Sequence, residues 1–159
     1  MADAASGDVQ VPPAWQGYNH VALVTRDLDA TIHFYQEVLG MELLGVAPAN
    51  PLHGRHCALR PGSHAAQTGY LHFFEYAGAP LFGPHDRSLQ ASVFDPGATF
   101  LSHISFTLPD EVAGQALQRR LSAYGVPTTP IMEQGDIYNM VFLDNNGLAL
   151  EAAWSKREA

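Results

Sequence analysis

Polar and apolar residues alternate most regularly in two short segments of the chain, residues 19–23 and 102–106. Each has a histidine (His20, His103) on a face that otherwise carries mostly small side chains, and bulkier apolar residues on the other face. Because successive side chains of a strand point to opposite faces, both segments are predicted to be strands. The small-residue face would leave space for a ligand, and the bulky face would pack under a helix.

A helical pattern follows each of these strands. Asp27 and Asp110 are typical N-cap residues, and Gly40 and Gly125 supply the left-handed conformation that often ends a helix. We therefore predict helices over residues 27–39 and 110–124. Their apolar sides would consist of Leu28, Ile32, Tyr35 and Leu39 in the first helix, and of Val112, Ala116, Leu117, Leu121 and Tyr124 in the second.

Further short apolar runs complete the pattern after each helix. Strands are expected at 41–46, 56–59 and 69–76, then, after an extended stretch at 126–132, at 138–143 and 148–154. The order strand, helix, three strands thus occurs twice. It predicts an α+β fold in which two βαβββ modules form a concave mixed sheet with the helices outside.

The same pattern sets the domain organisation that we expect. Residues 18–77 form the first module and residues 99–154 the second, joined by a proline-containing linker, 78–98, that could act as a lid. Residues 1–17 and 155–159 are predicted to be tails, and 63–68 a polar turn. The N-terminal residues lack the basic and apolar regions of a signal peptide, and no apolar stretch is long enough to span a membrane.

Charge and cysteine content narrow the function classes. The net charge is −8, from 8 basic and 16 acidic residues, and no basic run exists that would favour binding of nucleic acid. The single cysteine, Cys57, excludes an internal disulfide. It is expected to be a small buried residue, and it suits a reducing, cytoplasmic location.

Candidate ligands lie at matching places in the two modules. The first and last strands carry His20 and His72 in one module, and His103 and Glu151 in the other. In a duplicated sheet these four groups would converge near the pseudo-twofold axis, where imidazole and carboxylate suit a divalent first-row metal. A single strand histidine or glutamate more often has a structural role, so the prediction depends on the matched positions.

Other histidines are weaker candidates. His56 begins a short strand and could act as an acid or base, although a structural or surface role is commoner. Three more, His53, His64 and His85, lie in predicted loops, where solvent exposure is the usual state.

The motifs resemble those of the vicinal oxygen chelate superfamily, which includes glyoxalase I, methylmalonyl-CoA epimerase, fosfomycin-resistance enzymes and extradiol dioxygenases. The resemblance rests on residues 19–23, 26–29, 34–42, 102–106 and 143–151. It implies paired βαβββ modules with a metal between them, held by His20, His103 and Glu151.

The fourth ligand is left open between two residues of one strand. The resemblance places a glutamate, glutamine or similar group there, and in this chain His72 fills that position while Glu75 follows three residues later. Strand alternation does not let both point inward, so we expect His72, with Glu75 as the alternative. His72 could instead line the pocket as an acid or base that does not touch the metal.

The resemblance implies a metal-dependent lyase or isomerase, similar to glyoxalases and epimerases, that stabilises an enolate or oxyanion of a small substrate with adjacent oxygens. Glu151, His72 and His56 are the candidate catalytic residues, and Fe²⁺, Mn²⁺, Co²⁺, Ni²⁺ or Zn²⁺ the candidate cofactor. We expect a homodimer, with the two modules of one site drawn from one chain or from two.

Two alternatives remain. An extradiol-type dioxygenase would use Fe²⁺, but Val141 stands where such enzymes commonly carry a tyrosine. A drug-binding protein of the bleomycin-resistance kind would use the same groove without a metal.

Overall fold

In the computed structural model, the first strand of the first module lies at the edge of a sheet, next to the last strand of the same module. The structure describes residues 17–62, 69–80 and 101–156. The elements of the first module are β1 (His20–Thr25), α1 (Leu28–Ile32), the π-helix η1 (His33–Val38), β2 (Glu42–Ala47), β3 (His56–Arg60) and β4 (Tyr70–Glu75). The predicted polar turn 63–68 and most of the predicted linker and tails lie outside the described residues.

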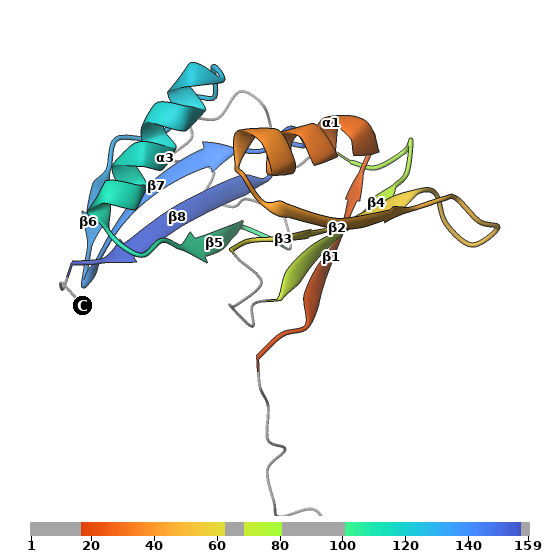
Figure 1. Ribbon diagram of the computed structural model, residues 1–159, viewed down its shortest axis with the longest axis horizontal. Helices are drawn as coiled ribbons and strands as arrows, with labels where there is room; N and C mark the ends of the chain where they lie inside the picture. The colour runs from red at the N-terminus through yellow and green to blue at the C-terminus, as the bar shows by residue number, and fades with distance from the viewer. Residues whose placement is uncertain (1–16, 63–68, 81–100, 157–159) are drawn as a thin grey trace, which may run out of the picture.

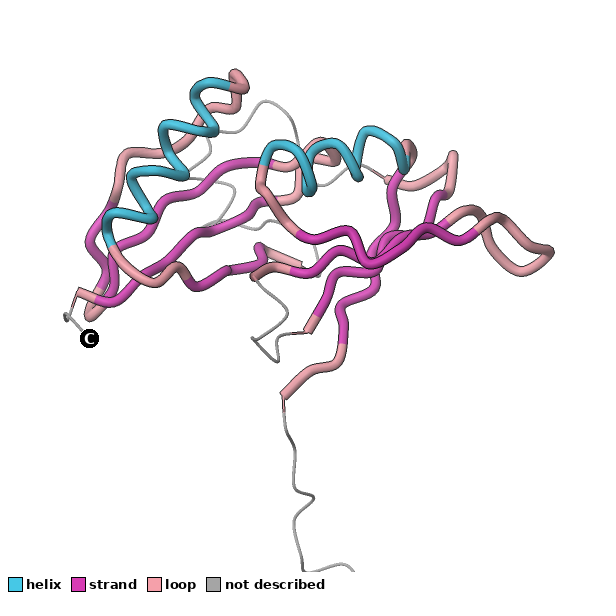
Figure 2. The backbone as a smooth tube through the Cα atoms, viewed as in Figure 1, coloured by secondary structure: helices cyan, strands magenta, loops and turns pink. Residues whose placement is uncertain are grey.

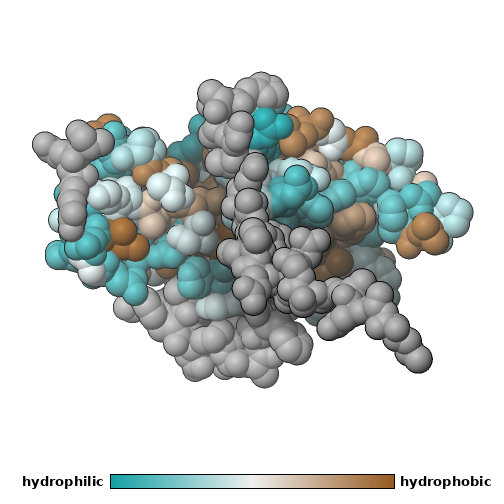
Figure 3. Space-filling model, turned by 90° about the horizontal axis from the view of Figure 1, so that it is seen from below, coloured by the Kyte–Doolittle hydropathy of each residue, from teal (hydrophilic) through white to brown (hydrophobic). Residues whose placement is uncertain are grey.

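The second module repeats this order. Its elements are β5 (His103–Thr107), α3 (Glu111–Ala123), β6 (Met132–Gln134), β7 (Ile137–Leu143) and β8 (Ala149–Ser155). The helical segments of both modules lie on the same side of the molecule, above the sheets (Figures 1 and 2). Figure 3 shows the opposite side, where hydrophilic and hydrophobic residues are mixed over the coloured surface.

The two sheets have the same strand order, β1-β4-β3-β2 and β5-β8-β7-β6. In each sheet the first strand pairs in parallel with the last, and the other pairs are antiparallel. The predicted α+β fold of two βαβββ modules is therefore confirmed. Within the described residues, β1 and β5 are edge strands, so each of the strands that carries a candidate histidine has one side unpaired.

Both predicted N-caps form, and the first helix then changes its winding. The carboxylate of Asp27 accepts from the amide of Ala30 at 2.9 Å. From His33 the helix is wound as a π-helix, and the amide of Leu39 bonds to the carbonyl of Phe34. A π-helix rotates by a smaller angle per residue than an α-helix does. Phe34 and Val38 are therefore buried in addition to the residues that the 3.6-residue period predicted.

The predicted apolar side of α3 is wrong at Val112, Ala116 and Tyr124, which are exposed. Val112 is 72% exposed and Tyr124 is 48% exposed, whereas Leu121 is fully buried. The helix packs on the sheet through Gly114, where an added Cβ would lie 2.6 Å from the ring of Trp154 on β8. The middle of α3 therefore lies close against β8, while Val112 in its first turn is exposed.

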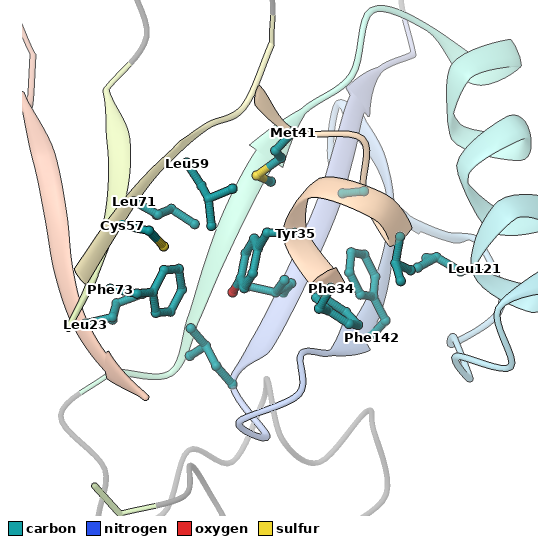
Figure 4. Packing of buried hydrophobic residues seen from close by; sticks show 14 of the residues in the cluster. Leu23, Phe34, Tyr35, Met41, Cys57, Leu59, Leu71, Phe73, Leu121 and Phe142 are labelled. Atoms are coloured by element: carbon teal, nitrogen blue, oxygen red, sulfur yellow. The ribbon is translucent and has the colours of Figure 1, made fainter. Parts of the chain in front are cut away.

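One hydrophobic core spans both modules (Figure 4). Leu23, Tyr35 and Phe73 come from the first module, and Leu121 and Phe142 from the second. The core explains why the helical segments of both modules share one side, since each covers apolar residues of its own sheet and also touches the other module.

Polar contacts fix how the modules are joined. The hydroxyl of Thr25, at the end of β1, donates to Asn146 Oδ1 in the turn between β7 and β8 at 2.8 Å. The guanidinium of Arg120 on α3 donates from Nε to the carbonyl of Val38 at 2.7 Å. These bonds connect the second module to the first at the end of β1 and at the end of η1.

Candidate metal and substrate site

The second module brings His103 and Glu151 together. They lie on the parallel neighbours β5 and β8, and His103 Nε2 is 3.3 Å from Glu151 Oε2. The Glu151 side chain is only 10% exposed. Its other oxygen accepts from Asn139 Nδ2 at 2.6 Å. The carboxylate is thus fixed between an amide and an imidazole.

The first module holds His20 and His72 in the equivalent place. They lie on the parallel neighbours β1 and β4, with ring centroids 5.8 Å apart and nearly perpendicular planes. His20 Nδ1 is 2.8 Å from Asn19 Oδ1. Because a carbonyl oxygen only accepts, Nδ1 is the donor of this bond, and Nε2 takes no part in it.

The residue before each first-strand histidine has the same task in both modules. Asn19 contacts Nδ1 of His20, and the hydroxyl of Ser102 lies 3.1 Å from Nδ1 of His103. A metal-binding histidine usually has its second nitrogen held in this way, which fixes the orientation of the ring. The donor set and its support therefore fit a divalent metal.

Each pair of candidate ligands belongs to one module. In the part of the chain that the structure describes, no three His, Cys, Asp or Glu side chains are gathered so that they could hold one metal ion. His20 with His72, and His103 with Glu151, thus form two pairs, which we call half-sites. The assignment of these four residues as ligands of one metal ion stays a prediction.

His56 lies beside His72. Their ring centroids are 5.0 Å apart, and His56 begins β3 opposite Phe74 on β4. The buried His56 Nδ1 has no hydrogen-bond partner among the described residues. Burial and the neighbouring imidazoles of His56, His20 and His53 lower the pKa of His72.

The prediction that His53 is solvent-exposed is wrong, because it is half-buried against His56. Its ring is held on both sides: Nε2 lies 3.0 Å from Asn50 Nδ2, and Nδ1 lies 2.9 Å from the carbonyl of Gly54. The other two loop histidines, His64 and His85, are outside the described residues.

Glu75, the alternative fourth ligand, is occupied elsewhere. Its carboxylate accepts from Arg55 at 2.9 and 2.8 Å and from the amide of Leu28 at the start of α1. The hydrogen bonds from Arg55 and Leu28 lower the pKa of Glu75 to about 2. The carboxylate therefore faces the first turn of α1.

The sequence analysis missed the residues that orient the ligand candidates. Asn139, which holds Glu151, is 1% exposed on β7. A polar side chain inside the otherwise apolar run Ile137–Leu143 was the signal that could have revealed it. Asn19 and Ser102 lie in the alternating segments 19–23 and 102–106, but no role was predicted for them.

Cys57 and Val141 behave as small core residues. Cys57 is 1% exposed, as predicted, and burial raises the pKa of its thiol to about 11. Val141 is also buried and faces Glu151 in the β7–β8 register.

None of the helices among the described residues has the length and apolar character of a membrane-spanning segment.

The family model described as Glyoxalase/Bleomycin resistance protein/Dioxygenase superfamily matches residues 17–152. The chain belongs to this superfamily, which confirms the resemblance to vicinal oxygen chelate proteins. No curated protein matches the chain.

Solved structures share the fold over nearly the whole chain. A glyoxylase/bleomycin resistance protein/dioxygenase domain from Frankia sp. EAN1pec is 25% identical, with a TM-score of 0.69, over 90% of this chain and 100% of that one. TnmS3, an antibiotic binding protein from Streptomyces sp. CB03234, is 18% identical (TM-score 0.65; 91% and 100% covered). A lactoylglutathione lyase from Agrobacterium tumefaciens is 21% identical (TM-score 0.60; 89% and 96% covered).

Proposed function

We propose that this protein is a metal-dependent enzyme of the lyase or isomerase type, acting on a small substrate with two adjacent oxygens. The observation that carries the proposal is the pair of matched half-sites, in which His20 and His103 each have Nδ1 held by the preceding residue. A structural histidine needs no such repetition in both modules. Support at Nδ1 is what a ligand that binds through Nε2 requires.

The complete site is formed by two copies of the chain. His20 and His72 of one copy would meet His103 and Glu151 of the other, giving three imidazoles and one carboxylate. This arrangement is supported by the edge positions of β1 and β5 and by the lack of a three-ligand group among the described residues of one chain. An edge strand has unpaired backbone groups that a second chain can cover. The expected homodimer then becomes a requirement of the site.

Each residue has a defined part in this proposal. A divalent metal supplies Lewis acidity that stabilises negative charge on substrate oxygens, and Fe²⁺, Mn²⁺, Co²⁺, Ni²⁺ and Zn²⁺ all suit the donor set. Asn139 keeps Glu151 in place, where the carboxylate can bind the metal and accept a proton. His56 stands next to His72 as a candidate acid or base. The engagement of Glu75 with Arg55 supports His72 as the fourth ligand.

The second candidate is a metal-free binding protein. It is favoured by the lack of a three-ligand group in the described part of a single chain. The likeness to the antibiotic binding protein TnmS3 shows the fold alone, but it is a reason to test for a binding protein. An extradiol-type dioxygenase that uses Fe²⁺ is less well supported than a lyase or isomerase, because the buried Val141 offers no hydroxyl beside Glu151. A cytoplasmic location remains a prediction from the lone Cys57.

Metal content tests the proposal. The protein is purified without added metal and analysed by element, alongside His20→Ala, His103→Ala and His33→Ala. The exposed His33 on η1 is the matched control, since it lies on the helical side of the molecule. We expect a stoichiometric metal in wild type and His33→Ala and its loss from the other two variants. Wild-type protein that retains no metal, even after loading with each candidate ion, would favour the binding protein.

A further inference from the structure

Six rings form a continuous surface in the first module, which we call the ring surface. It consists of His20 on β1, His56 on β3, Tyr70, His72 and Phe74 on β4, and His53 in the preceding loop. Neighbouring centroids are 4.3 Å apart for His72 and Phe74, 4.7 Å for His53 and His56, and 5.1 Å for His20 and Tyr70. The surface therefore runs without a break across three strands.

Strand alternation places these rings on the face of the sheet that has no helix. On β4, Leu71 and Phe73 are buried in the core, while Tyr70, His72 and Phe74 between them are only half-buried. On β3, Cys57 is buried and His56 is half-buried. The rings of β3 and β4 thus lie on the face opposite to Leu71, Phe73 and Cys57, which pack in the core.

Two pairs of these rings are stacked. His20 stacks on Tyr70 with an interplanar angle of 20°, and His56 stacks on Phe74 with an angle of 29°. Ring planes stacked in this way present flat π-surfaces to a further planar group. The open face of an antiparallel sheet is ordinarily polar, so a partly exposed run of aromatic side chains points to a binding role.

A second observation points to a ligand at the same place. His56 Nδ1 is buried and has no hydrogen-bond partner among the described residues. An unsatisfied buried nitrogen is costly, and it is explained when a bound molecule or an ordered water provides the partner.

We propose that the ring surface binds the planar aromatic part of the substrate. The substrate is then an aromatic compound with two adjacent oxygens, with its rings against Phe74 and Tyr70 and a polar group near His56. The placement of the oxygens beside His20 and His72 rests on the proposed metal site, whereas the stacking of the rings does not. The substrate class is thus narrowed from any small molecule with adjacent oxygens to aromatic ones.

Fluorescence titration of chelator-treated protein with 2,3-dihydroxynaphthalene tests the stacking without any metal. Phe74→Leu and Tyr70→Leu should each weaken binding by roughly three- to tenfold, since the loss of an aromatic pair has about this effect. Tyr124→Leu is the matched control, because its ring is exposed at the end of α3 and should leave affinity unchanged. Cyclohexane-1,2-diol, with the same adjacent oxygens and no aromatic ring, should bind far more weakly to wild type.

Proton NMR of the wild-type imidazoles makes the test independent of how the variants fold. Stacked naphthalene should shift the ring signals of His20, His56 and His72 and leave that of His33 unchanged. No binding and no shift, or equal affinity of all variants, would overturn the inference.

Elemental analysis of the same preparations keeps the two proposals apart. Protein that holds a metal but binds the naphthalene diol independently of Phe74 and Tyr70 would contradict only the ring surface. Ring-dependent binding by a protein that never retains a metal would support the ring surface and contradict the enzyme.

Discussion

The hydroxyl of Tyr35 donates a 2.9 Å hydrogen bond to Asp144 Oδ2, joining η1 of the first module to the turn that follows β7. Both side chains are buried, and the other carboxylate oxygen accepts from the amides of Asn146 and Leu148. Burial raises the pKa of both Tyr35 and Asp144. This pair is a buried polar contact between the two modules of one chain.

Tyr35→Phe removes the only donor that crosses from η1 to Asp144 among the described residues. One oxygen of a buried carboxylate then loses a hydrogen bond, so the free energy of unfolding should fall by about 1–3 kcal/mol. Urea denaturation measures the change. Tyr124→Phe, at a half-exposed ring, is the control and should change stability by less than about 0.5 kcal/mol. Equal stability of the two variants would show that the pair contributes little.

Gly114→Ala should destabilise the protein although alanine favours helices. The added methyl group would meet the Trp154 ring at 2.6 Å, and such overpacking costs about 1–3 kcal/mol. The gain in helix propensity is at most about 1 kcal/mol. Thermal unfolding should give a lower midpoint for Gly114→Ala and an almost unchanged one for Ser122→Ala, an exposed position of the same helix. A higher midpoint for Gly114→Ala would contradict the close packing of α3 on β8.

Stability should depend on pH through Glu75. Hydrogen bonds from Arg55 and the Leu28 amide lower its pKa from 4.5 to about 2. A carboxyl group with a lowered folded-state pKa stabilises the fold above its unfolded pKa, and this contribution is lost as the pH falls from 4.5 towards 2. Because the site is partly exposed, the effect is under about 1 kcal/mol.

Unfolding at pH 6 and at pH 2.5 checks this expectation. Glu75→Gln should be less stable than wild type at pH 6 and close to it at pH 2.5. The exposed Glu37→Gln serves as the control and should follow wild type at both values. A Glu75→Gln deficit of the same size at both values would contradict a role for the charge.

The Cys57 thiol should be unreactive in the folded protein. It is buried, and its pKa is raised to about 11, so little thiolate exists at pH 8. Ellman's reagent should label it slowly in buffer and rapidly in denaturing urea. Rapid labelling in buffer would show that the sheet under α1 opens readily.

The strands of both modules could be predicted because one face of each sheet is buried, which imposes alternation on β1 and β5. The helix starts could be predicted because Asp27 and Asp110 cap them locally. The π-helical winding after His33 could not, since no local signal distinguishes it from a regular helix. Nor could the exposure of Val112, because the helical period does not tell how closely each turn of α3 packs on the sheet.

The sequence predicts which candidate ligands pair within each module, but it does not predict how the two pairs are arranged relative to each other. Matching positions identify His20 and His103, because duplication preserves their place on the first strand. Whether the pairs meet depends on how the modules pack through contacts such as Tyr35 with Asp144, and strand periodicity carries no information about that. The ring surface was missed because His53 reaches it from a loop held by Asn50.

The proposal of a site shared between two chains is tested most directly by mixed dimers. A chain with His20→Ala and a chain with Glu151→Ala are given different tags, co-expressed and purified through both. In a mixed dimer one site then carries both substitutions and the other carries neither. A shared site predicts one bound metal ion per mixed dimer and none in either variant alone. No metal in the mixed dimer, with full occupancy in wild type, would contradict it.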